Sequence, residues 1–87
     1  MSSHHATDFA GPIDVAIVEA VRAKLPDADV KVSGGGGHFR IAVTSTGFAG
    51  QGLLARQRLV LSAIKHLLAG DRAPVHAVDE LITETPA

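Results

Sequence analysis

The sequence predicts an α+β fold: a single small domain with the element order αββααβ, in which helices lie on one face of a three-stranded mixed sheet. Three observations lead to this prediction. The chain has 87 residues, 46% of them hydrophobic, which is enough for one core and too few for two. Apolar residues recur every three to four positions in two stretches, which is typical of helices. In three other stretches they alternate with polar or small residues, which is typical of strands.

The first helix is predicted to begin at Pro12, because a proline at the first helical position lacks only an N–H that would have no partner there. Asp14 complements the helix dipole in the first turn, and Pro26 ends the helix. Residues 1–11 are polar and end in glycine, so we expect them to be disordered and the folded domain to cover residues 12–87. The apolar face of this helix comprises Ile13, Ala16, Ile17, Ala20, Val21 and Leu25.

The next two strand patterns are predicted to form an antiparallel hairpin. Residues 30–32 alternate, and residues 39–44 place their apolar side chains on one face. Between them, Ser33–Gly37 contains four consecutive glycines. Glycine loses more conformational entropy on ordering than any other residue. We therefore interpret this segment as a flexible hairpin loop.

A helical crossover is predicted to join the second strand to the third. After a loop, a wide apolar stripe runs over residues 53–68 and is ended by Gly70; it is either one helix or a short helix running into a longer one. A crossover of this length makes the strands on either side of it parallel. The last strand is predicted over residues 75–83, with a bulge or early fraying at Asp79-Glu80, where the alternation breaks.

Two histidines open the second and third strands. If these parallel strands are neighbours, their N-terminal ends share one edge of the sheet, and His38 and His76 converge beside the glycine loop. The chain contains no cysteine, so two imidazoles without a thiolate suggest half of a metal site, with the other half supplied by another molecule. The alternatives are that His76 is a structural or unused histidine and that His38 makes a hydrogen bond within the hairpin.

Charge and composition limit the classes of function that we expect for this chain. The net charge of −1 predicts no general attraction to nucleic acid. Residues 30–70 nevertheless contain no acid, so they form either an ordinary solvated surface or a cationic binding surface. We expect no enzyme activity, because neither a catalytic triad nor a pair of carboxylates framing a cleft is recognisable. The basic residues of this segment are Lys31, Arg40, Arg56, Arg58 and Lys65.

The expected location is the cytoplasm. The first residues lack the basic and long apolar regions of a signal peptide. No apolar run approaches the roughly 18 residues that are needed to cross a bilayer, so we expect no membrane association.

Several motifs, in this order along the chain, resemble the BolA family. They extend over nearly the whole domain, from about Ile13 to Pro86. The resemblance implies a fold related to type II KH domains. It also implies partnership with a monothiol glutaredoxin and a [2Fe–2S] cluster that is shared with that partner and glutathione and is not bound by the isolated chain. The motifs are the glycine-rich loop, His38-Phe39-Arg40-Ile41-Ala42-Val43, Ser45-x-x-Phe48-x-Gly50, Arg56-Gln57-Arg58-Leu59-Val60 and Val75-His76-Ala77-Val78.

The resemblance also implies roles for particular residues. The histidine of the family's Val-His-Ala motif is a cluster ligand, and it corresponds to His76. The family's second ligand comes from the loop between the first two strands; that loop holds only glycines here, which leaves His38 as the nearest candidate. The family's Arg-His-Arg triplet is Arg-Gln-Arg in this chain. The residues expected to contact the partner are Arg56, Arg58, Gly36 and Gly37.

The leading hypothesis is therefore a binding and regulatory module for iron–sulfur cluster trafficking or iron sensing. The alternative is a KH-like transcriptional regulator that binds nucleic acid, in which case DNA is a partner. The third hypothesis is a protein-interaction domain without a metal role. The alternative regulator would use the basic side chains of Lys31, Arg40, Arg56 and Arg58.

Overall fold

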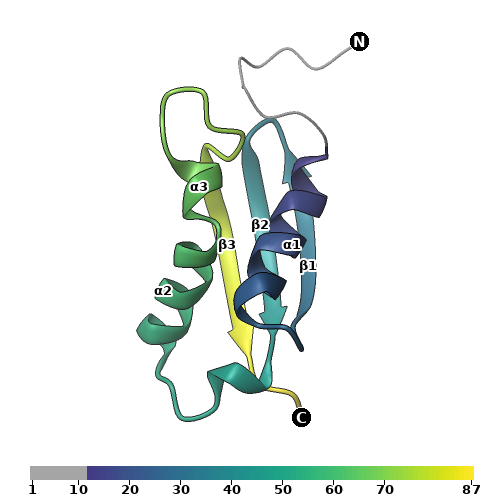
Figure 1. Cartoon of the computed structure of the whole chain (residues 1–87), viewed down its shortest axis with the longest axis vertical. Coiled ribbons are helices and arrows are strands. Elements are labelled where there is room, and N and C mark those ends of the chain that lie inside the picture. Colours follow the sequence, from purple (N-terminus) through teal and green to yellow (C-terminus); the bar gives the residue numbers. More distant parts are fainter. Residues whose placement is uncertain (1–11) are drawn as a thin grey trace.

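The elements of the computed structural model, which describes residues 12–87, follow the predicted order (Figure 1). The disorder predicted for residues 1–11 falls outside the described residues and stays a prediction. Within residues 12–87, no helix is both long and apolar enough to cross a membrane. The elements are α1 (Ile13–Lys24), β1 (Asp29–Gly35), β2 (His38–Thr44), the 3₁₀ helix η1 (Thr46–Phe48), α2 (Leu53–Ala63), α3 (Lys65–Leu68) and β3 (Ala77–Glu84).

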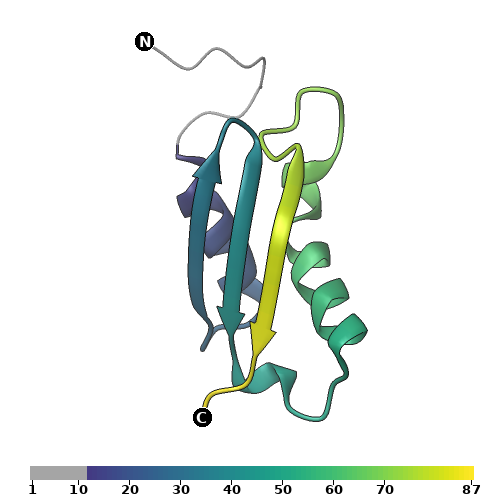
Figure 2. The ribbon, with the colours of Figure 1, turned by 180° about the vertical axis from the view of Figure 1, so that it is seen from behind.

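The sheet has the strand order β1-β2-β3, with β1 antiparallel and β3 parallel to β2. Figure 1 shows the helices in front of the sheet, and Figure 2 shows the three strands from behind with no helix over them. The predicted α+β fold, a mixed sheet with helices on one face, is therefore confirmed. β3 is parallel to β2 because the crossover through α2 and α3 is long enough to return the chain to the end of the sheet where β2 begins.

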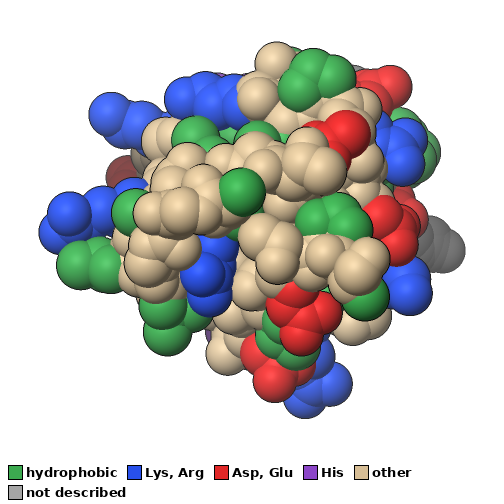
Figure 3. Space-filling view, turned by 90° about the horizontal axis from the view of Figure 1, so that it is seen from below, with side chains coloured by type: hydrophobic (Ala, Val, Ile, Leu, Met, Phe, Trp, Pro, Cys, Tyr) green, Lys and Arg blue, Asp and Glu red, His purple; other side chains and the backbone are tan. Residues whose placement is uncertain are grey.

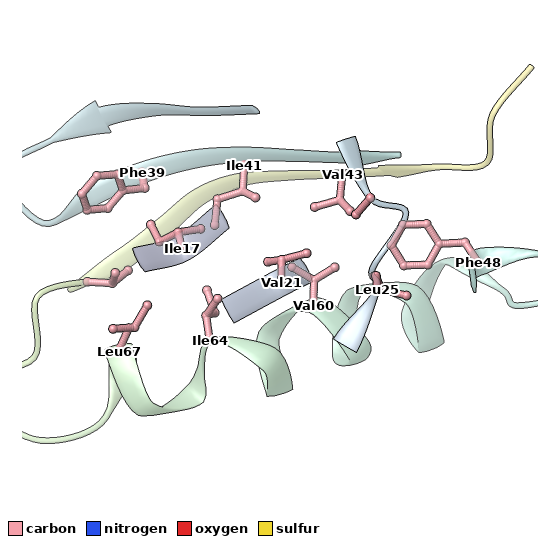
Figure 4. Packing of buried hydrophobic residues seen from close by; sticks show 12 residues of the cluster. Ile17, Val21, Leu25, Phe39, Ile41, Val43, Phe48, Val60, Ile64 and Leu67 are labelled. Carbon is pink, nitrogen blue, oxygen red and sulfur yellow. The ribbon is translucent and has the colours of Figure 1, made fainter. Parts of the chain in front are cut away.

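The hydrophobic core fills the space between β2 and the helices (Figure 4). The alternating side chains of β2 point inward, and the α1 face predicted from the three-to-four spacing packs against them. Pro12 immediately precedes α1 as its N-cap, one residue outside the first helical position predicted for it. The largest fully buried hydrophobic side chains are Ile17, Val21, Ile41, Val43, Phe48, Val60, Ile64 and Val75.

The hairpin loop is much shorter than predicted. β1 continues through Gly35, and only Gly36 and Gly37 form the turn, with φ angles of 63° and 86°. Positive φ at both central residues is the requirement of a tight type I′ hairpin turn. The prediction of a five-residue loop over 33–37 was wrong because backbone ladder bonds need no side chains, so glycines can pair as a strand without leaving an alternating pattern.

The helical crossover is interrupted near its end. The backbone of Ile64 leaves the helical region, with φ −104° and ψ 13°, and separates the longer α2 from the single turn of α3. The short helix therefore follows the longer one, the reverse of the order considered from the sequence. Gly70 follows α3 at φ 90°, the left-handed conformation in which glycine commonly terminates a helix.

The last strand begins at Ala77 and not at Val75. The N–H of Val75 donates to the carbonyl of Leu67, 3.0 Å away, so this residue is tied to α3 and its side chain is fully buried. The bulge predicted at Asp79-Glu80 is confirmed, since Phe39 pairs with Val78 while the next residue pairs with Glu80. Asp79 is the extra residue.

Candidate functional site

The two histidines come together at the edge of the sheet where the hairpin turn lies. His38 is the first residue of β2 and pairs with Ala77, the first residue of β3. His76 directly precedes that strand. The centroids of the two imidazole rings are 6.4 Å apart and the ring planes make an angle of 77°. Both side chains are exposed, so the pair is accessible from outside the protein and is not sealed in the core.

Gly37 fixes the backbone of His76 against the turn. Its carbonyl accepts hydrogen bonds from the N–H of His76 at 2.7 Å and of Ala77 at 3.0 Å. A Cβ atom at Gly37 would stand 2.7 Å from both Cγ and Nδ1 of the His76 ring. Because no real side chain tolerates that approach, the glycine allows the imidazole of His76 to lie directly on the turn.

Asp79 adds a carboxylate to the pair. Nδ1 of His38 lies 3.2 Å from Oδ1 of Asp79, and the two side chains are 59% and 49% exposed. Asp79 was not among the residues that the sequence marked as functional. The break in alternation at this position was the available signal, because a bulge can re-aim a side chain toward a neighbouring strand.

The donor set of this edge matches part of a metal site. Imidazole nitrogens are good ligands for iron, zinc and copper, and histidines replace thiolates in some [2Fe–2S] centres. An iron or zinc atom lies about 2 Å from a ligating nitrogen, so rings this close can reach one small cluster together. Among residues 12–87, no three or more His, Cys, Asp or Glu side chains are arranged to hold a metal ion. Within the described residues, the two imidazoles could therefore supply only part of a ligand set.

The structure places Gly36 and Gly37, but not Arg56 and Arg58, beside the histidines. Arg56 donates from Nε to Thr83 Oγ1 at 3.1 Å and from Nη1 to the carbonyl of Gln51 at 2.8 Å, so it ties α2 to the far end of β3. β3 has 8 residues, or about 26 Å of extended chain. Arg56 thus lies at the opposite end of the sheet from the histidine pair, and Arg58 follows it one half-turn later on α2.

That opposite end has a mixed surface. Seen from below (Figure 3), Lys, Arg and hydrophobic side chains project on both sides, whereas most of the acidic side chains lie away from the side of α2. Leu53 and Leu54 of α2 are 57% and 59% exposed. Arg58 is exposed on the same helix. This surface is therefore amphipathic rather than uniformly basic.

The four basic residues of the nucleic-acid alternative lie in two places. Lys31 pairs across the hairpin with Ala42, and Arg40 pairs with Ser33, which sets both basic side chains on the uncovered face of the sheet. The same face carries Glu80, the β3 partner of Arg40. The two arginines of α2 belong to the helical layer. The basic segment seen in the sequence is therefore not one continuous basic surface.

A second polar cluster, around Asp27, supports the loop into η1. The Ser45 hydroxyl and both the N–H and the hydroxyl of Thr46 donate to the Asp27 carboxylate, at 2.6 to 2.8 Å. These three hydrogen bonds, that of Ser45 first, lower the pKa of Asp27 to about 2. The Ser45 oxygen also accepts from the N–H of Gly47. The serine of the Ser45-x-x-Phe48 motif is thus a buried structural residue.

Comparison with known proteins identifies relatives of this fold. A family model described as "BolA-like protein" matches residues 3–87. "BolA-like protein 1" of Mus musculus is 39% identical over 92 aligned positions, which cover 90% of this chain and 61% of the mouse protein. The chain therefore spans less than two thirds of that relative's length.

Solved structures agree with this match. The solution structure of BolA1 from Mus musculus has a TM-score of 0.70 and 36% identity, and the alignment covers 99% of this chain and 76% of that one. BolA1 from Arabidopsis thaliana has a TM-score of 0.74 over 88% of this chain and 95% of that one. At 21% identity, the plant structure supports the fold alone.

Proposed function

Because the chain belongs to the family of BolA-like proteins, we propose that it is a binding and regulatory module that pairs with a monothiol glutaredoxin and shares a bridging [2Fe–2S] cluster with it. The proposed role is in iron–sulfur cluster trafficking or iron sensing. We propose no catalytic activity for the chain itself. A reducing compartment such as the cytoplasm suits this role, since the partner's thiols must stay reduced to act as ligands.

The observation that supports this proposal is the pair of exposed imidazoles, with ring centroids 6.4 Å apart, at the end of the sheet where the hairpin turn lies. His76 is the proposed ligand from the segment before β3, and His38 is the proposed ligand from β2. The chain has no cysteine, so sulfur ligands must come from glutaredoxin and glutathione.

The chain's own residues hold and orient the two ligands. Gly37 lets the His76 ring lie on the hairpin turn, and within residues 12–87 nothing lies within 4 Å of a Cβ built on Gly36, the other residue of the turn. The bound cluster supplies redox-active iron, and imidazole ligands raise its reduction potential relative to thiolate ligands. Metal-bound imidazole must be neutral, so protons compete with the metal for these ring nitrogens.

Co-expression with a monothiol glutaredoxin tests the proposal. The wild-type pair is expected to purify as a coloured complex whose visible circular dichroism differs from that of the cluster-loaded glutaredoxin alone. His76→Ala should abolish the difference or weaken the complex at least tenfold. His66→Ala is the matched control, because His66 is an exposed histidine on α3 outside the pair. A wild-type spectrum equal to that of glutaredoxin alone would refute the shared cluster.

A further inference from the structure

We propose that Asp79 is a positioning residue for His38: its carboxylate accepts a hydrogen bond from Nδ1–H and so presents Nε2 of the same ring as the free, ligating nitrogen. The inference rests on the proposed function for the identity of the ligand that Nε2 meets. The contact itself, 3.2 Å between Nδ1 and Oδ1, is a property of the chain alone.

The bulge in β3 keeps Asp79 and its neighbour Glu80 on the exposed side of the strand. Without it, residue 79 would pair with Arg40, and Glu80 would take the following place beside Ile41, on the buried face of β2. The extra residue lets Asp79 and Glu80 both stay exposed while Val78 and Leu81 pack against the core. Parallel strands rarely contain bulges, and bulges are enriched where a side chain must be re-aimed.

The chemistry of the contact matches a ligating histidine. A neutral imidazole carries one proton, and the hydrogen bond made by one ring nitrogen decides which nitrogen keeps it. An ionised carboxylate can only accept, so beside Asp79 the proton belongs on Nδ1. Histidines that bind metals almost always donate their other N–H to a carboxylate, carbonyl or water in this way.

Stability alone does not account for the arrangement. The two side chains are about half exposed, and a solvent-exposed pair of this kind contributes little to the stability of the fold. The bulge keeps the acidic residues off the core, whereas the contact between Asp79 and His38 constrains the orientation of the ring more than it contributes to the fold.

The test reads the tautomer of His38 in the free protein by long-range ¹H–¹⁵N NMR at mildly alkaline pH, where imidazoles are neutral. In the wild type, Nδ1 is expected to give the shift of a protonated nitrogen and Nε2 that of an unprotonated one. Asp79→Ala should move the proton toward Nε2, and Asp79→Glu should restore the wild-type pattern at least in part. Glu80→Gln is the matched control, because it removes a neighbouring charge on the other side of the bulge.

The outcomes separate this inference from the proposed function. A His38 tautomer that is unchanged by Asp79→Ala, in a variant whose amide spectrum shows an intact fold, overturns the positioning role. So does an equal change in Glu80→Gln, which would indicate a general charge effect. A tautomer change specific to Asp79 supports the role even if the wild type forms no cluster-bearing complex with glutaredoxin, and that second result would overturn the proposed function alone.

Discussion

Gly37 combines two constraints that no other residue type meets. Its φ of 86° is a left-handed conformation, and the place of its missing Cβ is occupied by the ring of His76. Gly36 has a similar φ of 63°, but nothing lies within 4 Å of a Cβ built on it. Substitutions at the two adjacent glycines can therefore distinguish the energetic cost of the backbone conformation from the effect of contact with His76.

We expect Gly37→Ala to lower the free energy of unfolding by more than the roughly 1–2 kcal/mol that a left-handed L-residue costs, and to displace the His76 ring. Gly36→Ala should show the conformational cost alone. Urea denaturation measures the stability of both variants, and imidazole NMR shifts report the ring. Equal stability losses with an unmoved His76 signal would show that the close approach at Gly37 is unimportant.

Asp27 gives a prediction with a defined pH window. Its pKa falls from 3.8 to about 2 on folding, because the Ser45 and Thr46 hydrogen bonds favour the carboxylate. A lowered pKa in the folded state stabilises the protein above the unfolded-state value, and this contribution disappears as the pH falls through about 2. Wild type should therefore unfold at higher urea than Asp27→Asn at neutral pH, with a gap that closes below about pH 4. A gap that does not change with pH would contradict this account.

At the scale of elements, α2 carries two arginines with different roles. Arg56 is partly buried and bonds to two other segments, whereas Arg58 is exposed. Arg56→Ala should destabilise the fold by at least about 1.5–3 kcal/mol, since it removes two hydrogen bonds from a charged donor and each is worth about that much. Arg58→Ala should change stability by less than about 0.5 kcal/mol.

Thermal or urea unfolding of the two variants checks the first half of this prediction. The second half concerns the partner. If Arg58 is a contact residue, its loss should weaken the glutaredoxin complex while leaving the chain as stable as the wild type. A large stability loss in Arg58→Ala would show instead that both arginines serve the fold.

The sequence predicted those helices and strands in which apolar residues recur at regular intervals. α1 and the paired face of β2 were readable because their apolar residues reach the core at regular intervals. The bulge at Asp79 was readable because it breaks such an interval. The extension of β1 through Gly34 and Gly35 could not be predicted, since glycine has no side chain that could alternate. Residue 34 must be glycine because a Cβ there would collide with the carbonyl oxygen of His38.

The site was predictable in part for the same reason. Parallel strands joined by a crossover start at the same edge, which brought His38 and His76 together on topology alone. The contact between His38 and Asp79, by contrast, depends on the register after the bulge, and register is set by packing across 41 positions of sequence. The internal bonds of Arg56 likewise depend on where α2 crosses the end of β3.

At the scale of the whole molecule, the charge distribution bears on the nucleic-acid alternative. The basic residues are divided between the open sheet face and the helical layer, and the open face also carries acids. The affinity of a protein for DNA falls with salt in proportion to the phosphates it neutralises, with a slope of about −0.9 per contact. We expect a shallow slope, no more than about −2, in an anisotropy titration of the free protein. A slope of about −4 or steeper would favour the regulator over the cluster-sharing module.

His38 belongs to the hairpin of β1 and β2, whereas His76 comes beside it only when β3 pairs with β2. A chain still on the ribosome, or one that has lost its third strand, offers single donors that chelate nothing. A ligand that binds both imidazoles therefore recognises the folded protein and not incompletely folded chains. Because such a ligand binds the folded state and not the unfolded state, it would raise the melting temperature of the protein by mass action. Binding of the ligand and completion of folding would then be thermodynamically coupled.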